Sequence, residues 1–349
     1  MPFIAYQERR FSADVLETIE RANEILNDYA EQGYDLTLRQ LYYQFVARGF
    51  IPNEDRQYKR LGSIVNDARL AGLIDWDHIT DRTRNLRQNS HWKTPVEIID
   101  ACAAQFQIDK WATQPRYVEV WVEKDALVGI LQVACEPLDV AYFSCRGYTS
   151  QSEMWATGQR LLSHFRAGQE VHILHLGDHD PSGVDMSRDI EERLLLFMRH
   201  HIQEDLNENR VKDMPRHLED ETSDEYHARL RRFLTANRRY IFPVKVHRIA
   251  LNMAQVRQYN PPPNPAKLTD SRCRAYIEEH GQQSWELDAL EPAVLTALIQ
   301  DSVRALRNEQ RWQAQKAIED RHRAQLHACA SRWEEISETL KGGDDAKNE

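Results

Sequence analysis

Apolar residues near the start of the chain recur every three or four positions, which is the spacing of one face of a helix. This spacing predicts amphipathic helices at 13–28, around 38–45 and at 58–70. The turn-rich segment that follows, 71–85, has the length of a short ribbon. Three helices and a ribbon are typical of a winged-helix module, and a plain helical bundle is the alternative.

The third predicted helix has a basic side. Lys59, Arg60 and Arg69 lie opposite its apolar positions. Because the third helix of such a module reads a DNA groove, we expect these side chains to contact DNA. Arg82 and Arg84, in the segment that follows, are further candidates for phosphate contacts.

From residue 117 the pattern changes to short apolar runs, each followed by a polar turn and an amphipathic helix. This alternation predicts βαβ units and a mostly parallel sheet. A charged stretch at about 199–240 interrupts it, which we interpret as a surface insertion, with an ordinary helix pair as the alternative. The strand-like runs lie within 117–124, 141–149, 171–183 and 242–251.

The end of the chain is helical in pattern and rich in charge, and its last residues, 342–349, have the composition of a disordered end. The sequence therefore predicts three parts. They are a helical domain at 1–112, an α/β domain at 113–290 and a helical tail at 291–349.

Composition narrows the class of protein. Hydrophobic residues make up 41% of the 349 residues, and no apolar run reaches the roughly 18–20 residues of a membrane span. The five cysteines contain no C-x-x-C pair, so we expect reduced thiols. Together with the lack of a long apolar run, this predicts a cytoplasmic protein with no membrane partner. A net charge of −10 argues against indiscriminate coating of nucleic acid, although a local basic face is compatible with it.

Acidic residues stand where two predicted strands end. Glu123 follows one run, and Asp178 and Asp180 follow another. Because the carboxyl ends of parallel strands form the ligand-binding edge of an open sheet, these three carboxylates are expected to converge. Oxygen ligands suit Mg²⁺, which acts on phosphates, so the chemistry indicated is phosphoryl transfer.

Two other interpretations of these residues exist. Glu123 beside Lys124 has the pattern of a surface ion pair, and Asp residues are common in turns. His175 and His179 near the acids suggest a transition-metal site or an H-D phosphohydrolase. We disfavour this because those histidines lie along a strand and its turn, where successive side chains alternate between faces.

Three segments occur in order with strand–turn–helix context: V-E-K-D-A-L at 122–127, C-R-G-Y-T-S at 145–150 and L-G-D-H-D-P-S-G at 176–183. The chain thereby resembles a Toprim (Rossmann-like) domain, and more narrowly the family of the topoisomerase VI A subunit and the meiotic double-strand-break transesterase. The resemblance implies a Mg²⁺ site, a winged-helix domain before the Toprim domain, and DNA as substrate. The residues that it assigns are Glu123, Asp178 and Asp180 to the metal, Glu123 and Lys124 to catalysis, and Arg146 to DNA.

The same family has an R-x-x-[FY]-Y segment whose last tyrosine is the nucleophile, and Arg39-Gln-Leu-Tyr-Tyr43 stands in that place. A helical wheel puts Tyr42 on the apolar face and Tyr43 on the side of Arg39. We therefore expect Tyr42 in the core, Tyr43 as the catalytic tyrosine, and Arg39 as a residue that favours its ionised phenol.

These observations favour Mg²⁺-dependent DNA cleavage by an enzyme similar to a topoisomerase VI A subunit. A hydrolytic Toprim nuclease with water as nucleophile is the first alternative, and a non-catalytic DNA-binding module is the second. The resemblance further implies a homodimer in which the tyrosine and the metal site meet in trans, and strand passage would need a separate ATPase subunit. The segment 284–290 has no counterpart in the family's motifs.

Overall fold

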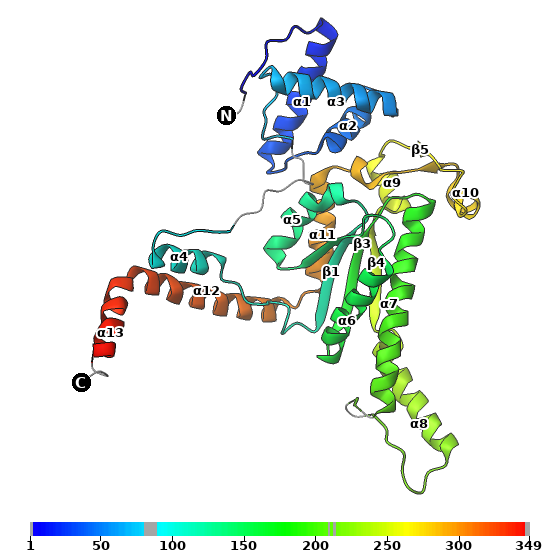
Figure 1. Ribbon diagram of the computed structural model, residues 1–349. Coiled ribbons are helices and arrows are strands. Elements are labelled where there is room, and N and C mark those ends of the chain that lie inside the picture. Colours follow the sequence, from blue (N-terminus) through cyan, green and yellow to red (C-terminus); the bar gives the residue numbers. More distant parts are fainter. Residues whose placement is uncertain (1–2, 80–88, 209, 212–213, 346–349) are drawn as a thin grey trace. The chain divides into compact units, whose positions relative to one another are not determined.

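A parallel sheet of four strands, in the order β2-β1-β3-β4, organises the larger part of the computed structural model (Figure 1). The structure describes residues 3–79, 89–208, 210–211 and 214–345. Residues of β1 and β3 are buried almost throughout, as expected for central strands covered on both faces. The α/β prediction is thus confirmed. The strands are β1 (Arg116–Val122), β2 (Ala141–Ser144), β3 (Glu170–Leu176) and β4 (Val244–Ala250).

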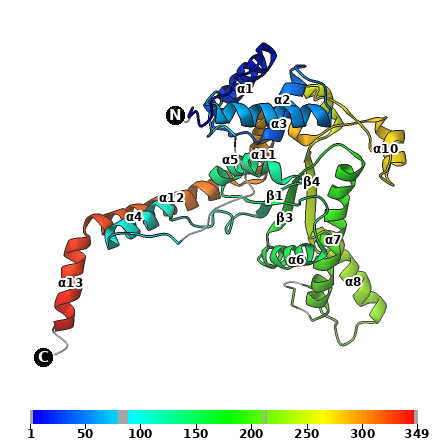
Figure 2. The same ribbon diagram turned by 45° about the horizontal axis from the view of Figure 1, so that its top comes forward.

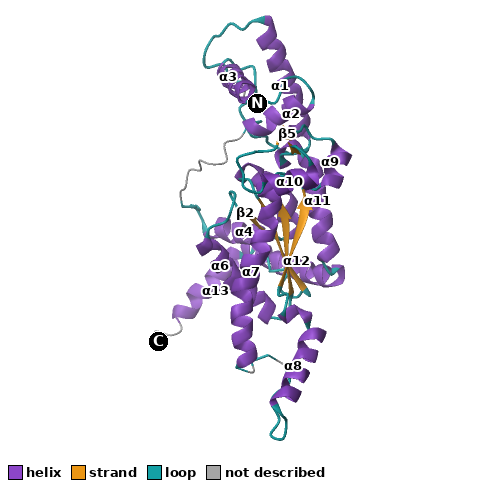
Figure 3. Ribbon diagram, turned by 90° about the vertical axis from the view of Figure 1, so that its right-hand side faces the viewer, coloured by secondary structure: helices purple, strands orange, loops and turns teal. Residues whose placement is uncertain are grey.

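Helices cover both faces of this sheet. Figure 3 shows the strands nearly edge-on, with α11 on one side and α6 and α7 on the other. The cluster under α6 and α7 contains Trp121 from β1, Ile173 from β3 and Leu194 from α7, all fully buried. These helices are α5 (Val128–Cys135), α6 (Gln151–Arg166), α7 (Pro181–Asn207) and α11 (Pro292–Leu306).

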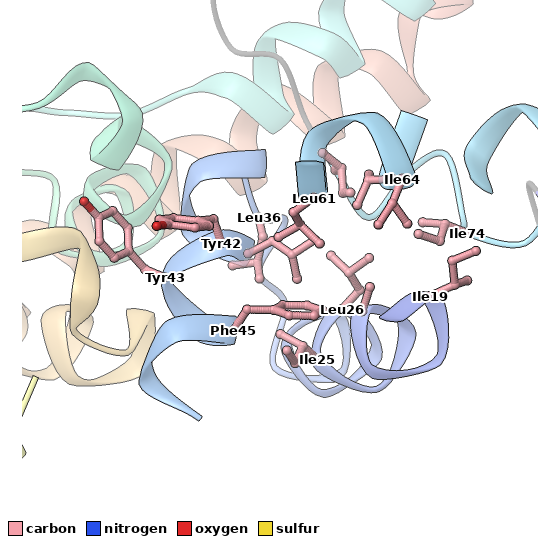
Figure 4. Packing of buried hydrophobic residues seen from close by; sticks show 14 of the residues in the cluster. Ile19, Ile25, Leu26, Leu36, Tyr42, Tyr43, Phe45, Leu61, Ile64 and Ile74 are labelled. Atoms are coloured by element: carbon pink, nitrogen blue, oxygen red, sulfur yellow. The ribbon is translucent and has the colours of Figure 1, made fainter. Parts of the chain in front are cut away.

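The three N-terminal helices form a second apolar cluster in the same unit (Figure 4). A capping box, in which Thr37 and Gln40 each satisfy the other's backbone N–H, fixes the start of the second helix. The bounds of the predicted helices are confirmed closely. They are α1 (Ala13–Glu31), α2 (Leu38–Ala47) and α3 (Asp55–Leu70).

The ribbon expected after α3 is not a paired hairpin in the part that the structure describes. Residues 71–79 form two isolated bridges, one from Ala71 to Ala5 and one from Ile79 to Leu36. The rest of the segment lies outside the described residues. The helical part of the prediction therefore holds, and the wing remains a prediction.

The charged stretch expected to interrupt the fold begins later than predicted. Helix α7 continues past residue 199 because Met198, Ile202 and Leu206 extend its buried stripe. The elements that follow are α8 (Ser223–Ala236), α9 (Met253–Tyr259), β5 (Asn264–Pro265), α10 (Cys273–His280) and β6 (Gln283–Ser284).

A smaller compact unit combines two distant pieces of the chain, 84–115 and 307–349, while 1–83 and 116–306 form the larger one. In it α4 lies along α12 in both views (Figures 1 and 2), and the Trp111 and Trp312 rings contact edge to face. The tail thus begins after α11 and not at 291, because α11 packs on the sheet through its buried face. Its helices are α4 (Pro95–Gln105), α12 (Glu309–Ser331) and α13 (Trp333–Asp345).

Helix α13 extends into the segment that was expected to be disordered, because it includes residues 342–345. Among the helices of the described residues, none combines the length and the apolar character that crossing a bilayer requires.

Candidate active site

The ends of β1 and β3 are joined through Glu123. Its backbone N–H donates to Leu176 O at 2.9 Å, and its carboxylate Oε2 accepts from the backbone N–H of Asp178, also at 2.9 Å. Burial raises the pKa of Glu123. The two strand ends that the sequence placed at one edge are therefore in direct contact.

Asp178 is enclosed at this edge, with 5% of its surface exposed. Its Oδ1 accepts from the backbone N–H of Leu287 at 2.8 Å, and its Oδ2 lies 2.8 Å from Lys124 Nζ. Burial raises the pKa of Asp178 well above its usual value, even though the Lys124 ammonium opposes that shift. The Asp178 carboxyl is therefore shielded from solvent and held by a backbone donor and a lysine.

A short segment after β6 brings two more acids to Asp178. The backbones of His179 and Trp285 form an antiparallel bridge, with N–H···O distances of 2.8 and 2.9 Å. This bridge sets the register in which Glu286 and Asp288 face the end of β3. Sequence reasoning missed both residues, although the E-L-D spacing within 284–290 was a visible signal.

Lys124 lies among these acids. Its Nζ is 2.8 Å from Asp178 Oδ2 and 2.9 Å from Asp288 Oδ1, and it also contacts Glu286. Burial alone would lower the pKa of Lys124, but the three carboxylates raise it. The same ammonium lowers the pKa of Glu286, against the upward effect of burial. Lys124 is therefore charged and held at the sheet edge.

The acids converge in a different set from the predicted one. Asp178, Glu286 and Asp288 each offer an oxygen within 4.8 Å of the other two. Asp180 instead begins α7, where its Oδ1 accepts from Gly183 N at 2.6 Å. In the part of the chain that the structure describes, Glu123, Asp178 and Asp180 form no such group of three, because the Asp180 side chain is turned to the helix N-terminus.

The turn that carries these residues requires a glycine at 183. A β-carbon there would lie 2.3 Å from Asp178 O and 3.0 Å from Glu123 Oε2, so any other residue would displace one of them. Arg248 on β4 supports the same turn by donating to the carbonyls of Gly177 at 3.0 Å and Gly183 at 2.7 Å. The backbone of this turn is therefore held in place by residues on or next to β1, β3 and β4.

Helix α2 brings Arg39 and Tyr43 to this edge within one chain. Arg39 Nε donates to Asp288 Oδ2 at 3.0 Å, and its guanidinium carbon lies 5.7 Å from the centre of the Tyr43 ring. In Figure 4 Tyr43 lies at the margin of the apolar cluster, and its hydroxyl points away from the aliphatic side chains. The tyrosine named by the sequence and the acid cluster are thus neighbours.

Two expectations about the tyrosines need correction. Tyr43 is not on an open side of the helix, because it is as buried as Tyr42, with exposures of 6% and 4%. The pKa of Tyr43 is also raised overall, although Arg39 acts to lower it. Burial raises that pKa, with Asp288 and Glu286 adding to the effect of burial, and together they outweigh Arg39 and Lys124. Tyr42 is a core residue as predicted, its hydroxyl donating to Asn53 at 3.0 Å.

The basic residues predicted to contact DNA differ in their surroundings. Lys59 and Arg60 are exposed on α3, with Arg60 paired to Asp14 at 2.5 Å. Arg69 does not project freely, since it donates to Trp76 O at 2.8 Å and stacks on the Trp76 ring. Exposed Arg146 pairs with Asp125. Arg82 and Arg84 lie outside the described residues.

The donor set at Asp178, Glu286 and Asp288 fits a hard divalent cation. All three candidate ligands are carboxylate oxygens, which Mg²⁺ prefers, and they lie within 4.8 Å of one another. Comparison of the chain with protein-family models, with curated proteins and with solved structures finds no match. Function is therefore inferred from the geometry of this site together with the resemblance of its motifs.

Proposed function

We propose that the protein cleaves DNA in a Mg²⁺-dependent phosphoryl transfer. The observation that carries this proposal is that Arg39 lies against the Tyr43 ring and also pairs with Asp288, which belongs to the group of Asp178, Glu286 and Asp288 at the carboxyl edge of a parallel sheet. The resemblance of its motifs to a Toprim domain preceded by a winged helix supports the same chemistry. Mg²⁺ at this edge would neutralise charge that develops on the phosphate oxygens.

Tyr43 is the proposed nucleophile. Its phenolic oxygen forms a bond to phosphorus while the bond from phosphorus to one sugar oxygen breaks. The phenol proton needs a base, and Asp288 and Glu286 are the carboxylates whose charges act most strongly on that hydroxyl. Glu123, whose raised pKa favours a protonated carboxyl, is suited to return a proton to the leaving sugar oxygen.

Hydrolysis by water is the second candidate, and the burial of Tyr43 favours it. Only 6% of the surface of Tyr43 is exposed. The raised pKa of its phenol makes it a poor nucleophile unless a base removes the proton. In that reaction water takes the place of the phenol, and Tyr43 serves only to pack α2 against the sheet edge.

DNA is the proposed substrate, with exposed Lys59, Arg60 and Arg146 as candidate phosphate contacts. A homodimer, a separate ATPase subunit and a cytoplasmic location are proposals that rest on the resemblance alone. Within one chain, Arg39 and Asp288 already join the helical part to the acid cluster. Cleavage in trans would therefore require α2 to release this contact.

The decisive experiment incubates the protein with internally labelled supercoiled DNA and Mg²⁺ and compares the products with and without proteinase. We expect nicked or linear DNA that enters the gel fully only after proteinase, and no cleavage with EDTA. Asp178→Asn should abolish cleavage, because Asp178 belongs both to the acids expected from the sequence and to the group that converges at the sheet edge. Lys245→Gln, on the exposed face of β4, is the matched control and should cleave normally. Intact DNA under all conditions would refute the proposal.

A further inference from the structure

A cation already occupies the acid cluster. The ammonium of Lys124 lies within hydrogen-bond distance of Asp178 and Asp288 and contacts Glu286, which are the three residues whose carboxylates group within 4.8 Å. The side chains of Lys124 and Glu286 are each 17% exposed, and that of Asp288 is fully buried. The ammonium thus contacts all three carboxylates of the group and not just one of them.

The balance of charge in the cluster is incomplete. Arg39 is the second cation that contacts it, at 3.0 Å from Asp288 and 3.5 Å from Glu286. With all three carboxylates ionised, two positive side chains face three negative ones, which leaves one negative charge. Replacing the ammonium by a divalent cation would bring this sum to zero, and uncompensated charge is costly where water is excluded.

The position of Lys124 in the chain allows the ammonium to leave without disturbing the carboxylates. Lys124 lies in the turn after β1, whereas Asp178 follows β3 and the other two acids follow β6. The backbone bridge between His179 and Trp285, and the bond from Leu287 N to Asp178, hold the acids together independently of the lysine. Four rotatable side-chain bonds separate the ammonium from the backbone of Lys124.

We propose that Asp178, Glu286 and Asp288 form a divalent-cation site in which the Lys124 ammonium and the metal exchange. Lys124 fills the site when metal is absent. When metal enters, the ammonium is released at the same sheet edge, where it can pair with a phosphate oxygen of the substrate. This last role rests on the proposed function, whereas the exchange itself rests on the contacts of Lys124.

The test measures metal binding directly, with Mn²⁺ as the probe in calorimetry and no DNA present. Lys124→Gln removes the competing charge, so we expect it to bind Mn²⁺ about tenfold or more tightly than the unaltered chain. It should also melt lower than the unaltered chain in EDTA and gain more in Tm from Mn²⁺. Lys267→Gln, which alters a cation 3.7 Å from Asp180, is the matched control and should change Mn²⁺ affinity less than about twofold.

The ligands are tested through Glu286→Gln, chosen because Glu286 is less buried than Asp288. In the Lys124→Gln background it should cost at least tenfold in Mn²⁺ affinity, and circular dichroism would verify that the variant is folded. Equal or weaker Mn²⁺ binding by Lys124→Gln would overturn the exchange, as would unchanged binding by the double variant. If exchange is observed but DNA stays intact, the cation site stands and the proposed function fails.

Discussion

The phenol of Tyr43 is surrounded by charges of both signs, and their balance determines when it can react. Asp288 and Glu286 raise its pKa in addition to burial, and Arg39 and Lys124 oppose them. A divalent cation bound to the two acids would offset their negative charge, which disfavours ionisation of the phenol. If the protein is a transesterase as proposed, metal binding and activation of the tyrosine are therefore expected to be linked.

Tyr43→Phe removes only the hydroxyl and is the sharpest test of the nucleophile. If the phenol attacks, labelled DNA should migrate with the protein in denaturing gels, and this variant should eliminate the adduct. Tyr42→Phe is the matched control, since Tyr42 is the adjacent buried tyrosine and its hydroxyl bonds to Asn53. It should keep the adduct while losing about 1 kcal/mol of stability. Equal cleavage by Tyr43→Phe without any adduct would instead establish water as the nucleophile.

Sequence identified the tyrosine but not its surroundings. The helical wheel of α2 describes one apolar face, which packs on α1 and α3. The opposite side is covered by residues 287–289, which lie more than 200 positions away in the chain. The periodicity of a helix reveals only its main packing face and not a second contact made by a distant segment. Tyr43 was therefore expected to be more exposed than it is.

At the scale of single elements, Asp180 caps the N-terminus of α7, and a role in metal binding is the expectation to be tested. Asp180→Asn keeps a side-chain oxygen for the cap, so its stability should change by no more than a few tenths of a kcal/mol. Asp180→Ala should cost about 0.5–2 kcal/mol, measured by urea unfolding. If Asp180 also binds metal, Asp180→Asn will lose cleavage while remaining folded. Full cleavage by a folded Asp180→Asn would limit the residue to its capping role.

Strand β3 makes stability depend on pH through His175. Burial lowers the pKa of His175 to about 3, with Arg248 adding to the effect, and its Nδ1 lies 2.8 Å from Ser187 Oγ. The folded state keeps His175 neutral, whereas the unfolded state binds a proton below about pH 6.5. Its contribution to stability is therefore complete above about pH 6.5 and is lost as the pH falls toward 3.

Urea unfolding at pH 7 and pH 5 measures this effect. His175 should account for about 2 kcal/mol of the stability lost between these two pH values. His175→Gln should show a correspondingly smaller loss, whatever its stability at pH 7. The same pH dependence in both proteins would indicate that His175 is protonated in the fold or that other groups determine the loss.

The elements themselves were largely predictable, and the segment that completes the site was not. Alternation and apolar runs identify β1, β3 and β4, because each strand is long enough to show its pattern. Residues 283–290 form a two-residue strand and a short turn, which carry no periodicity. Their place is fixed by the bridge between His179 and Trp285, a contact across more than 100 residues that local patterns cannot reveal.

For the whole molecule, a net charge of −10 makes DNA binding depend on local basic faces. Reversal of charge at Lys59 and Arg60 should weaken binding to all DNA sequences alike and reduce the salt slope by about 1–2. Charge reversal at Lys316 and Arg321, two exposed residues on α12 in the smaller unit, makes the same change in net charge and is the control. An unaltered salt slope would move the phosphate contacts to Arg146 or to the segment of Arg82 and Arg84.

The smaller unit has a consequence for how the chain matures during synthesis. Helix α4 leaves the ribosome roughly 200 residues before α12, the helix on which it packs. At about 5–20 residues per second, α4 waits on the order of 10–40 s without its partner. Glu286 and Asp288 also emerge only after the sheet that they complete. All four strands of the sheet therefore leave the ribosome before the acid cluster is complete, so the proposed activity would become possible only late in translation.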